Sequence, residues 1–324
     1  MKSTESIGRV VVLGGGTGIS PCLSGLKRYT SDVTAIVTVA DDGGSSGRLR
    51  KDYDMLPPGD IRNCLVALAE GDPRLAQLFA HRFEDDLLRG HAFGNLFLAV
   101  VAKQTGDFRA AIDLAAATLG VKGRVIPSTE SRVVLVASHP DGSKSTGESR
   151  ISRSGKPIID IELRPKPRPV SDEIRRVVEA ADLVVLGPGS LFTSIIPNLL
   201  VEGMAECVAA AKGRVVYVAN IATQPGETNG FDLGAHVRAV RDLGGLSRID
   251  GVVVHEGVVS AEIRARYSQA GADILRAEPG AESVEGIPLV RAKVVGVESG
   301  LLRHTASELA AVLAALARGG SVHP

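Results

Sequence analysis

The chain has 324 residues, which is enough for about two domains or one large α/β unit with a sizeable buried core. Lysine and arginine number 37, as do aspartate and glutamate, so no net charge attracts the chain to nucleic acid or to an anionic membrane. Aromatic residues make up 3% and tryptophan is absent, which argues against a base-stacking platform for single strands.

Cysteine usage and the amino-terminal segment indicate a cytoplasmic protein. The cysteines Cys22, Cys64 and Cys207 are far apart, match no metal-ligand spacing, and fit a reducing compartment. The first residues lack the layout of a signal peptide. The longest uncharged stretch, Leu183 to Val201, is interrupted by glycine and proline, so we expect a strand, a turn and a helix there and no membrane span.

Runs of valine, isoleucine and leucine alternate with helical patterns along most of the chain. This alternation predicts an α/β fold with a mainly parallel sheet and crossover helices. Strands are expected at Arg9–Leu13, Val33–Val39, Leu183–Leu186, Arg214–Ala219 and Gly251–His255. Helices are expected at Ile61–Ala69, Pro73–His81, Asn95–Lys103, Phe108–Thr118, Ser171–Ala181, Leu199–Ala211, Leu233–Leu243 and Ala306–Ala317.

One stretch breaks this alternation. Residues 121–170 contain two short strand patterns, Val133–Ala137 and Ile158–Leu163, joined by the turn-rich sequence HPDGSKSTGES. We therefore expect one unit over residues 1–312, with a small β-rich insertion or subdomain at 121–170. Residues 319–324 are expected to form a flexible tail.

The first predicted strand leads into the glycine-rich sequence GGGTGIS, followed by a helical pattern. Glycines at such a turn let backbone N–H groups approach a phosphate, which predicts a ligand contact at Gly15, Gly16, Thr17 and Gly18. The dinucleotide pattern G-x-G-x-x-G is only partly met, because Ile19 or Pro21 stands at its third glycine position. The alternative is a tight turn without a ligand.

The second predicted strand ends at the acidic pair Asp41 and Asp42. An acid about 20 residues beyond a glycine loop is where a ribose hydroxyl is gripped, and adjacent carboxylates could also hold Mg²⁺ through a nucleotide phosphate. The alternative is an Asp-Gly turn that only closes a loop.

Two more polar loops follow predicted strands. The sequence GPGSLFTS supplies Gly187, Gly189, Ser190 and Thr193, and NIATQPGET supplies Asn220 and Gln224. In a parallel sheet these loops emerge with the first two at the carboxyl ends of the strands, where open α/β folds bind ligands. Together the four loops make a nucleotide-type site the leading hypothesis.

Single polar residues near predicted helix starts are weaker candidates. Asp60 is a potential helix cap, and Asn63 could read a base or a hydroxyl. His91 is interpreted as a hydrogen-bonded structural histidine and Asn95 as a candidate ligand contact. Arg303 could meet an anionic ligand or remain a solvated surface charge.

The motifs GGGTGIS, TVADDGGSSGRLR, PPGDIRNC, HAFGNL, LGPGSLFTSIIPNLL and NIATQPGETNGF occur in this order and resemble the YvcK family of gluconeogenesis factors. The resemblance extends over nearly the whole chain and implies a Rossmann-like core. The family is related to the CofD transferases, which use Mg²⁺ in building a deazaflavin cofactor. The absence of tryptophan departs from CofD members and weighs against deazaflavin transfer.

The resemblance implies a site and a role. The implied ligand is UDP-N-acetylglucosamine or NAD(P), and the implied ligand-binding residues are Gly15, Gly16, Thr17, Gly18, Asp41, Asp42, Asn63, Asn95, Gly187, Gly189, Ser190, Leu191, Thr193, Asn220, Gln224 and Arg303. The implied role is a non-enzymatic regulator of cell-wall precursor supply and cell shape during gluconeogenic growth, with glucosamine-6-phosphate synthase as a partner. The alternatives are a Mg²⁺-dependent CofD-like transferase and, less favoured, an NAD(P)-dependent enzyme. A homodimer is the base-rate expectation.

Overall fold

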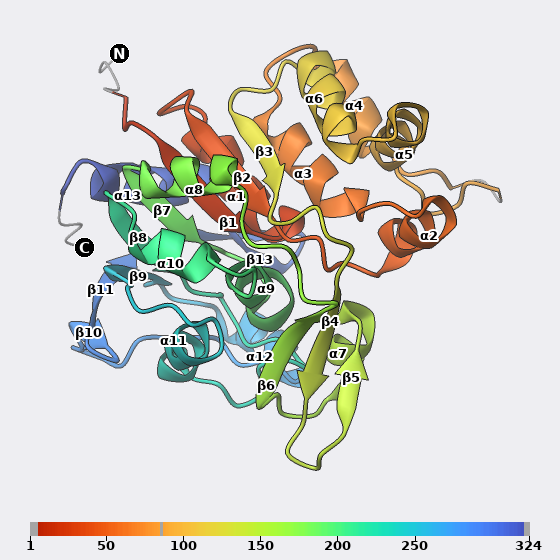
Figure 1. Cartoon of the computed structure of the whole chain (residues 1–324). Coiled ribbons are helices and arrows are strands. Elements are labelled where there is room, and N and C mark those ends of the chain that lie inside the picture. The colour runs from red at the N-terminus through yellow and green to blue at the C-terminus, as the bar shows by residue number, and fades with distance from the viewer. Residues whose placement is uncertain (1–5, 85–86, 321–324) are drawn as a thin grey trace.

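A twisted sheet forms the centre of the molecule in the computed structural model, which describes residues 6–84 and 87–320 (Figure 1). Its strands are β1 (Val10–Gly14), β2 (Val33–Val37), β3 (Arg124–Pro127), β7 (Leu183–Leu186), β8 (Arg214–Val218), β9 (Gly251–His255), β10 (Ser283–Val284) and β11 (Ile287–Ala292). Their order across the sheet is β10-β11-β9-β8-β7-β1-β2-β3. Every neighbouring pair is parallel except β10 with β11. The predicted mainly parallel α/β fold is confirmed.

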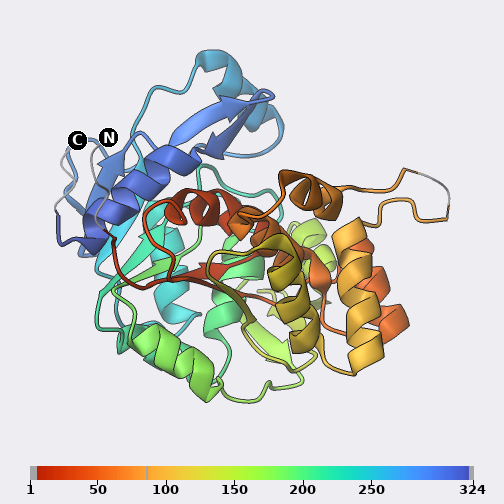
Figure 2. The same cartoon turned by 90° about the horizontal axis from the view of Figure 1, so that it is seen from above.

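The sheet is buried on both faces, which explains its nearly continuous valine, isoleucine and leucine runs. In β1, Val10 and Val12 pack into one hydrophobic cluster, while Val11 and Leu13 pack into another on the opposite face. The first cluster contains α1 (Gly16–Leu26), α3 (Pro58–Leu68) and α13 (Ala306–Ala317). The second contains α8 (Asp172–Glu179), α10 (Met204–Ala209) and α11 (Leu233–Asp242). Figure 2 shows these helices on the two sides of the sheet.

Helices also fill the long crossover from β2 to β3. They are α2 (Gly44–Tyr53), α3, α4 (Pro73–Ala80), α5 (Phe93–Thr105) and α6 (Phe108–Leu119). The helical patterns expected from position 61 to position 118 are confirmed by α3 to α6. The short α2 was not expected, because its sequence GGSSGRLR is a turn-rich pattern.

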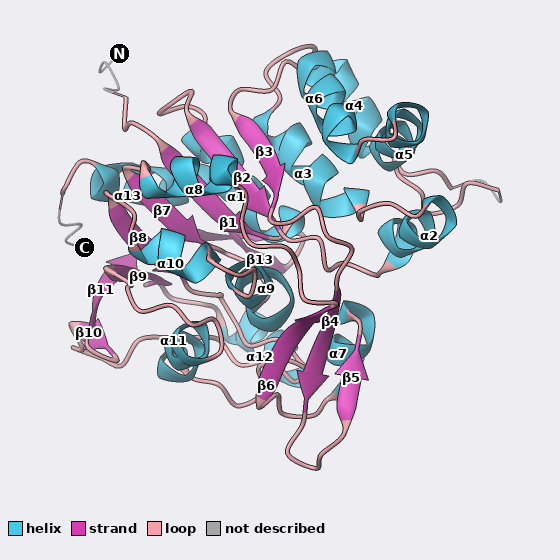
Figure 3. Ribbon diagram, viewed as in Figure 1, coloured by secondary structure: helices cyan, strands magenta, loops and turns pink. Residues whose placement is uncertain are grey.

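A second, three-stranded antiparallel sheet stands beside the main one (Figure 3). It consists of β4 (Val134–Ser138), β5 (Lys144–Thr146) and β6 (Asp160–Arg164), with α7 (Glu148–Ser154) packed against it. Within the segment 121–170, β3 pairs with β2 of the main sheet, so the small sheet itself begins at Val134.

A hairpin near the carboxyl end was missed by the sequence analysis. Its strands β12 (Val295–Glu298) and β13 (Leu301–His304) form a separate two-stranded sheet. The hairpin is tied to α12 (Ala261–Gln269), because Arg266 Nη1 donates to the Gly300 carbonyl and Leu302 N donates to the Tyr267 hydroxyl. Figure 2 shows α12 and the hairpin projecting from one side of the molecule.

The single helix predicted at Leu199–Ala211 is wrong. A π-helical turn η1 (Leu191–Ile195) continues into α9 (Ile196–Leu199), and the chain then breaks before α10. The break ends at Gly203, whose φ of 86° lies in the left-handed region that an interior helical residue cannot adopt.

Part of the predicted tail, residues 321–324, lies outside the described residues. Within the described residues, none of the helices combines the length and the apolar character needed to cross a membrane.

Candidate functional site at the carboxyl ends of the strands

A polar cavity of about 600 Å³ lies where β1 and β7 meet. The chain leaves β1 toward β2 on one side and leaves β7 toward β8 on the other, so this is the point at which the strand order reverses. Open α/β sheets bind their ligands outside the carboxyl ends of the strands at such a point. The cavity therefore stands where the fold places a ligand.

The cavity brings together nine of the sixteen residues expected in the site. They come from the loops after β1, β2, β7 and β8 and from the hairpin, and are Gly15, Thr17, Gly18, Asp41, Gly189, Ser190, Asn220, Gln224 and Arg303. Among the residues not expected are Glu148 from α7, Tyr267 from α12 and His304 from β13. Neither Glu148 nor Tyr267 belongs to a motif that could have revealed it.

The glycine loop after β1 faces a carboxylate that belongs to the protein itself. Helix α1 begins at Gly16, and the N–H groups of Gly16 and Thr17 stabilise the charged carboxylate of Asp60 from α3. A side chain at Gly16 would overlap the backbone of Asp60, and one at Gly18 would overlap the Pro188 carbonyl oxygen. In this structure the loop is glycine-rich because other backbone packs against it, and its first amides face Asp60 instead of an open phosphate site.

The two adjacent acids after β2 have different roles. Asp41 lines the cavity, and its Oδ1 accepts a hydrogen bond from the Gly43 N–H at 2.8 Å. Asp42 does not line the cavity; its Oδ1 accepts from the Ser149 N–H at 2.9 Å and so fastens the start of α7. The pair expected to contact the ligand together therefore divides into one lining residue and one structural residue.

Three acidic residues, Asp41, Asp60 and Glu148, line the cavity. Burial, reinforced by the nearby charges of Asp41 and Asp60, raises the pKa of Glu148 to about 8. Burial and the charge of Asp41 raise the pKa of Asp60 to about 6. Glu148 is thus mostly protonated at neutral pH and can donate a hydrogen bond to a ligand oxygen.

These acids do not form a preorganised magnesium site. Within residues 6–84 and 87–320, no group of three or more His, Cys, Asp or Glu side chains is placed to hold a metal ion. Asp42 is committed to Ser149, and Asp60 faces the amides at the start of α1. The sequence-based hypothesis of Mg²⁺ held by Asp41 and Asp42 through a nucleotide phosphate stays a prediction.

A buried acid organises the loop after β7. Glu227 accepts a hydrogen bond from Ser152 Oγ at 2.8 Å and another from Ser190 Oγ. Ser190 in turn accepts from the Thr193 hydroxyl at 2.7 Å. Of the predicted residues in this loop, Gly189 and Ser190 line the cavity. Gly187, Leu191 and Thr193 are buried and do not line it.

Two of the three predicted asparagines, Asn63 and Asn95, lie outside this cavity. Asn63 Nδ2 donates to Thr17 Oγ1 at 3.1 Å and lines an adjoining groove. Asn95 is 1% exposed and donates to Ser45 Oγ at 3.1 Å, which also contacts His91 Nδ1 at 3.0 Å. Asn95 therefore joins α5 to α2 in a structural network, and His91 has the hydrogen-bonded position that was expected of it.

The hairpin supplies the cation of the cavity. Arg303 is exposed on β13, and within the described part of the chain no carboxylate forms an ion pair with it. The neighbouring His304 is largely buried, and burial together with His255 lowers its pKa to about 4, so it is neutral at physiological pH. Arg303 is thus the positive charge that the cavity offers to an anionic ligand.

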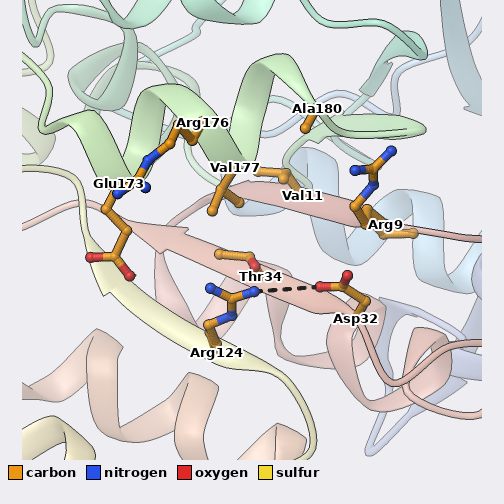
Figure 4. A pocket seen from close by; sticks show the side chains of 10 residues that line it. Arg9, Val11, Asp32, Thr34, Arg124, Glu173, Arg176, Val177 and Ala180 are labelled. Atoms are coloured by element: carbon orange, nitrogen blue, oxygen red, sulfur yellow. Dashed lines mark ion pairs between the residues drawn. The ribbon is translucent and has the colours of Figure 1, made fainter.

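A third hollow lies at the opposite ends of the strands and has a different character. It is lined by residues of β1, β2, β3 and α8, and its charges are largely compensated within the protein (Figure 4). Arg124 pairs with Asp32 at 3.9 Å, and Arg9 pairs with Asp182 at 3.4 Å. It lies at the edge of the sheet that open α/β folds do not use for ligands.

Comparisons with known proteins agree with this architecture. Residues 10–295 match the family described as 2-phospho-L-lactate transferase CofD. The chain is 43% identical to a gluconeogenesis factor of Halalkalibacterium halodurans over 93% of this chain and 94% of the relative. It is 40% identical to a gluconeogenesis factor of Bacillus subtilis over 94% of this chain and 96% of that protein.

A solved structure is similar over nearly its whole length. The crystal structure of a UPF0052 family protein from Bacillus halodurans superposes with a TM-score of 0.90 at 42% sequence identity. The alignment covers 94% of this chain and 99% of that one.

Proposed function

This chain belongs to the gluconeogenesis factor family, and we propose that it binds UDP-N-acetylglucosamine at the carboxyl ends of β1 and β7. In this proposal the protein is a regulator of cell-wall precursor supply and cell shape during growth on gluconeogenic carbon, not an enzyme. Its partner is glucosamine-6-phosphate synthase, and ligand occupancy alters their contact.

Arg303 is the observation that carries the proposal. A cavity of about 600 Å³ at the strand-order reversal has hydroxyl and amide groups on its walls and one arginine without a carboxylate partner in the described residues. The side-chain amides of Asn220 and Gln224 offer hydrogen bonds to hydroxyl-rich groups, and an arginine binds phosphate oxygens strongly. A nucleoside diphosphate sugar carries both kinds of group.

The position of Arg303 also supports a regulatory role. Arg303 comes from the β12–β13 hairpin, which exposes the apolar side chains Val297 (59%) and Leu301 (40%). A ligand bound to Arg303 favours hairpin positions in which Arg303 faces the cavity and thereby changes the surface that the hairpin offers to a partner. A ligand can act in this way without being converted.

The experiment is calorimetric titration with UDP-N-acetylglucosamine, followed by analysis of the recovered nucleotide. We expect saturable binding, an intact ligand, and a loss of at least about tenfold in affinity for Arg303→Ala, since a charged hydrogen bond is removed. The control is Arg124→Ala, which alters the hollow at the other end of the strands.

Other outcomes point to the alternatives. Conversion of the nucleotide would support the CofD-like transferase that the match over residues 10–295 suggests. Binding of NAD(P) with exclusion of the UDP-sugar would assign the cavity to a dinucleotide.

A further inference from the structure

Arg62 is a buried arginine without a carboxylate partner. It lies on α3, is only 4% exposed, and its Nε has no hydrogen-bond partner. Its Nη2 donates to Asn63 Oδ1 at 2.6 Å, and within residues 6–84 and 87–320 it forms no ion pair. Burial and the nearby Arg82 lower its pKa to about 10, and the charge of Asp60 opposes this shift, so the guanidinium stays charged and is only partly compensated. A buried cation held in this way is costly unless a bound anion compensates it.

Arg62 faces a second groove, which adjoins the polar cavity. This groove of about 740 Å³ lies between α1, α3 and the β12–β13 hairpin. It shares Thr17, Pro21, Arg303 and His304 with the polar cavity, so the two hollows adjoin, and together they are called the cleft. Val66, Ala67 and Val297 give the groove an apolar wall.

The acids and the arginines are unevenly distributed along this cleft, although Glu298 lines the groove and Arg303 lines both parts. Asp41, Asp60 and Glu148 lie in the polar cavity, where the charge of Asp41 raises the pKa values of the other two, so Asp41 and Asp60 would repel a diphosphate placed beside them. Asp60 also faces the α1 amides that would otherwise attract a phosphate. The two arginines of the cleft, Arg62 and Arg303, both line the groove.

We propose that Arg62 and Arg303 form a clamp for the diphosphate of a nucleoside diphosphate sugar. The inference rests on the proposed function and assigns an orientation to its ligand. The nucleoside lies against the apolar wall of the groove, and the hydroxyl-rich sugar points into the polar cavity.

The orientation follows from the chemistry of the two lobes. The carboxyl and amide groups of the polar cavity can exchange hydrogen bonds with sugar hydroxyls. A nucleobase has apolar faces, which can pack against Val66, Ala67 and the exposed Val297 of the groove. The diphosphate joins these two parts in the ligand, and Arg303 stands where the two lobes meet. Asn63, which follows Arg62 on α3, donates a hydrogen bond to the Thr17 hydroxyl of α1 and so links these two helices at the groove.

The test uses Arg62→Met, which keeps the length of the side chain and removes its charge. We expect the ligand-free variant to fold and to melt close to the wild type, because the buried charge that is lost is only partly compensated, by Asp60. We expect its affinity for UDP and for UDP-N-acetylglucosamine to fall by at least about tenfold. A structural role alone would lower the melting temperature and would not selectively weaken the phosphate ligands.

Two comparisons sharpen the result. Arg62→Lys keeps the charge but not the forked geometry, so it should recover part of the lost affinity. Arg176→Met, in the hollow of Figure 4, is the control and should bind both ligands as the wild type does.

The clamp and the proposed function fail in different ways. A folded Arg62→Met variant with wild-type affinity for UDP and UDP-N-acetylglucosamine would overturn the clamp and leave the proposed function standing. A wild type that does not bind UDP-N-acetylglucosamine would overturn the proposed function. Titration with inorganic pyrophosphate then decides on the clamp, since binding that is lost in Arg62→Met supports it and the absence of binding contradicts it.

Discussion

Asp60 stands where a strand–glycine loop–helix unit ordinarily receives a phosphate. Its carboxylate is stabilised by the N–H groups of Gly16 and Thr17, and its backbone packs against Gly16. A negative charge at the start of a helix is favourable, so the protein satisfies this position internally. The ligand's phosphates therefore need cations elsewhere, and Arg303 and Arg62 are placed to supply them.

The raised pKa of Glu148 predicts a pH-dependent stability. Its pKa rises from 4.5 to about 8 in the folded protein, so between these values the folded state binds more protons than the unfolded state. The stability contributed by the protonated form is therefore complete below about pH 4.5 and is lost as the pH rises to about 8.

We expect Glu148→Gln to remove part of this dependence. Melting temperatures measured from pH 5 to pH 9 should fall less steeply for the variant, which should exceed the wild type at pH 9 by at least about 1 kcal/mol in unfolding free energy. The exposed Glu308→Gln serves as the control. Identical slopes for Glu148→Gln and the wild type would contradict the assigned environment of Glu148.

At the scale of elements, the site depends on the close approach of the loops after β1 and β7. Gly18 has no room for a side chain, because a Cβ there would overlap the Pro188 carbonyl oxygen and lie 2.7 Å from the Gly189 Cα. Both neighbours are backbone and cannot move aside as a flexible side chain could. The spacing of the two loops, and with it the shape of the polar cavity, is fixed by this contact.

Gly18→Ala should therefore destabilise the fold and weaken binding together. We expect a loss of about 1–3 kcal/mol in unfolding free energy, the usual cost of overpacking, measured by denaturant unfolding. Gly251→Ala is the matched control, since a Cβ there makes only ordinary contacts at 3.7 Å and beyond. Equal stability of the two variants would contradict the close approach.

The elements that the sequence predicted well are those with a strong local pattern. Four candidate loops were located because each follows a run of buried β-branched residues, as after β1 and β8. The hairpin was missed because β12 and β13 have mixed burial and no regular alternation. The helix expected at Leu199–Ala211 fails because Gly203 adopts a left-handed conformation that tertiary packing, and no local pattern, decides.

Single site residues were predicted less completely than the loops that carry them. Asp42 occurs in the same motif as the lining residue Asp41, yet it bonds to Ser149, and Asn95 bonds to Ser45 in a motif that supplies no lining residue. The pKa shifts of Glu148 and Arg62 depend on neighbours that are far away in the sequence. Asp41 acts on Glu148, and Arg82 acts on Arg62. Only the three-dimensional arrangement reveals such burial and charge effects.

At the scale of the whole molecule, the hairpin and Tyr267 of α12 line one side of the cleft, and the loops after the central strands, α1, α3 and Glu148 of α7 line the rest. The hairpin is largely exposed and is hydrogen-bonded to α12 through Arg266 and Tyr267. A ligand that bridges Arg303 to Arg62 joins the hairpin to α3. Binding should therefore rigidify the hairpin more than any element of the sheet.

Amide hydrogen exchange tests this expectation. Addition of UDP-N-acetylglucosamine should slow exchange in Val295–His304 and at the start of α3, and should leave β3 and α8 near the hollow of Figure 4 unchanged. Protection confined to the loops after β1 and β7, with none in the hairpin, would show that Arg303 does not engage the ligand.

The central claim is that the cleft binds a nucleoside diphosphate sugar without converting it, and calorimetric titration of the wild type and Arg303→Ala tests it most directly. The account predicts saturable binding of UDP-N-acetylglucosamine, chemically intact ligand after incubation, and at least about tenfold weaker binding by the variant. Equal affinity of the two proteins, absence of binding, or conversion of the nucleotide would contradict it.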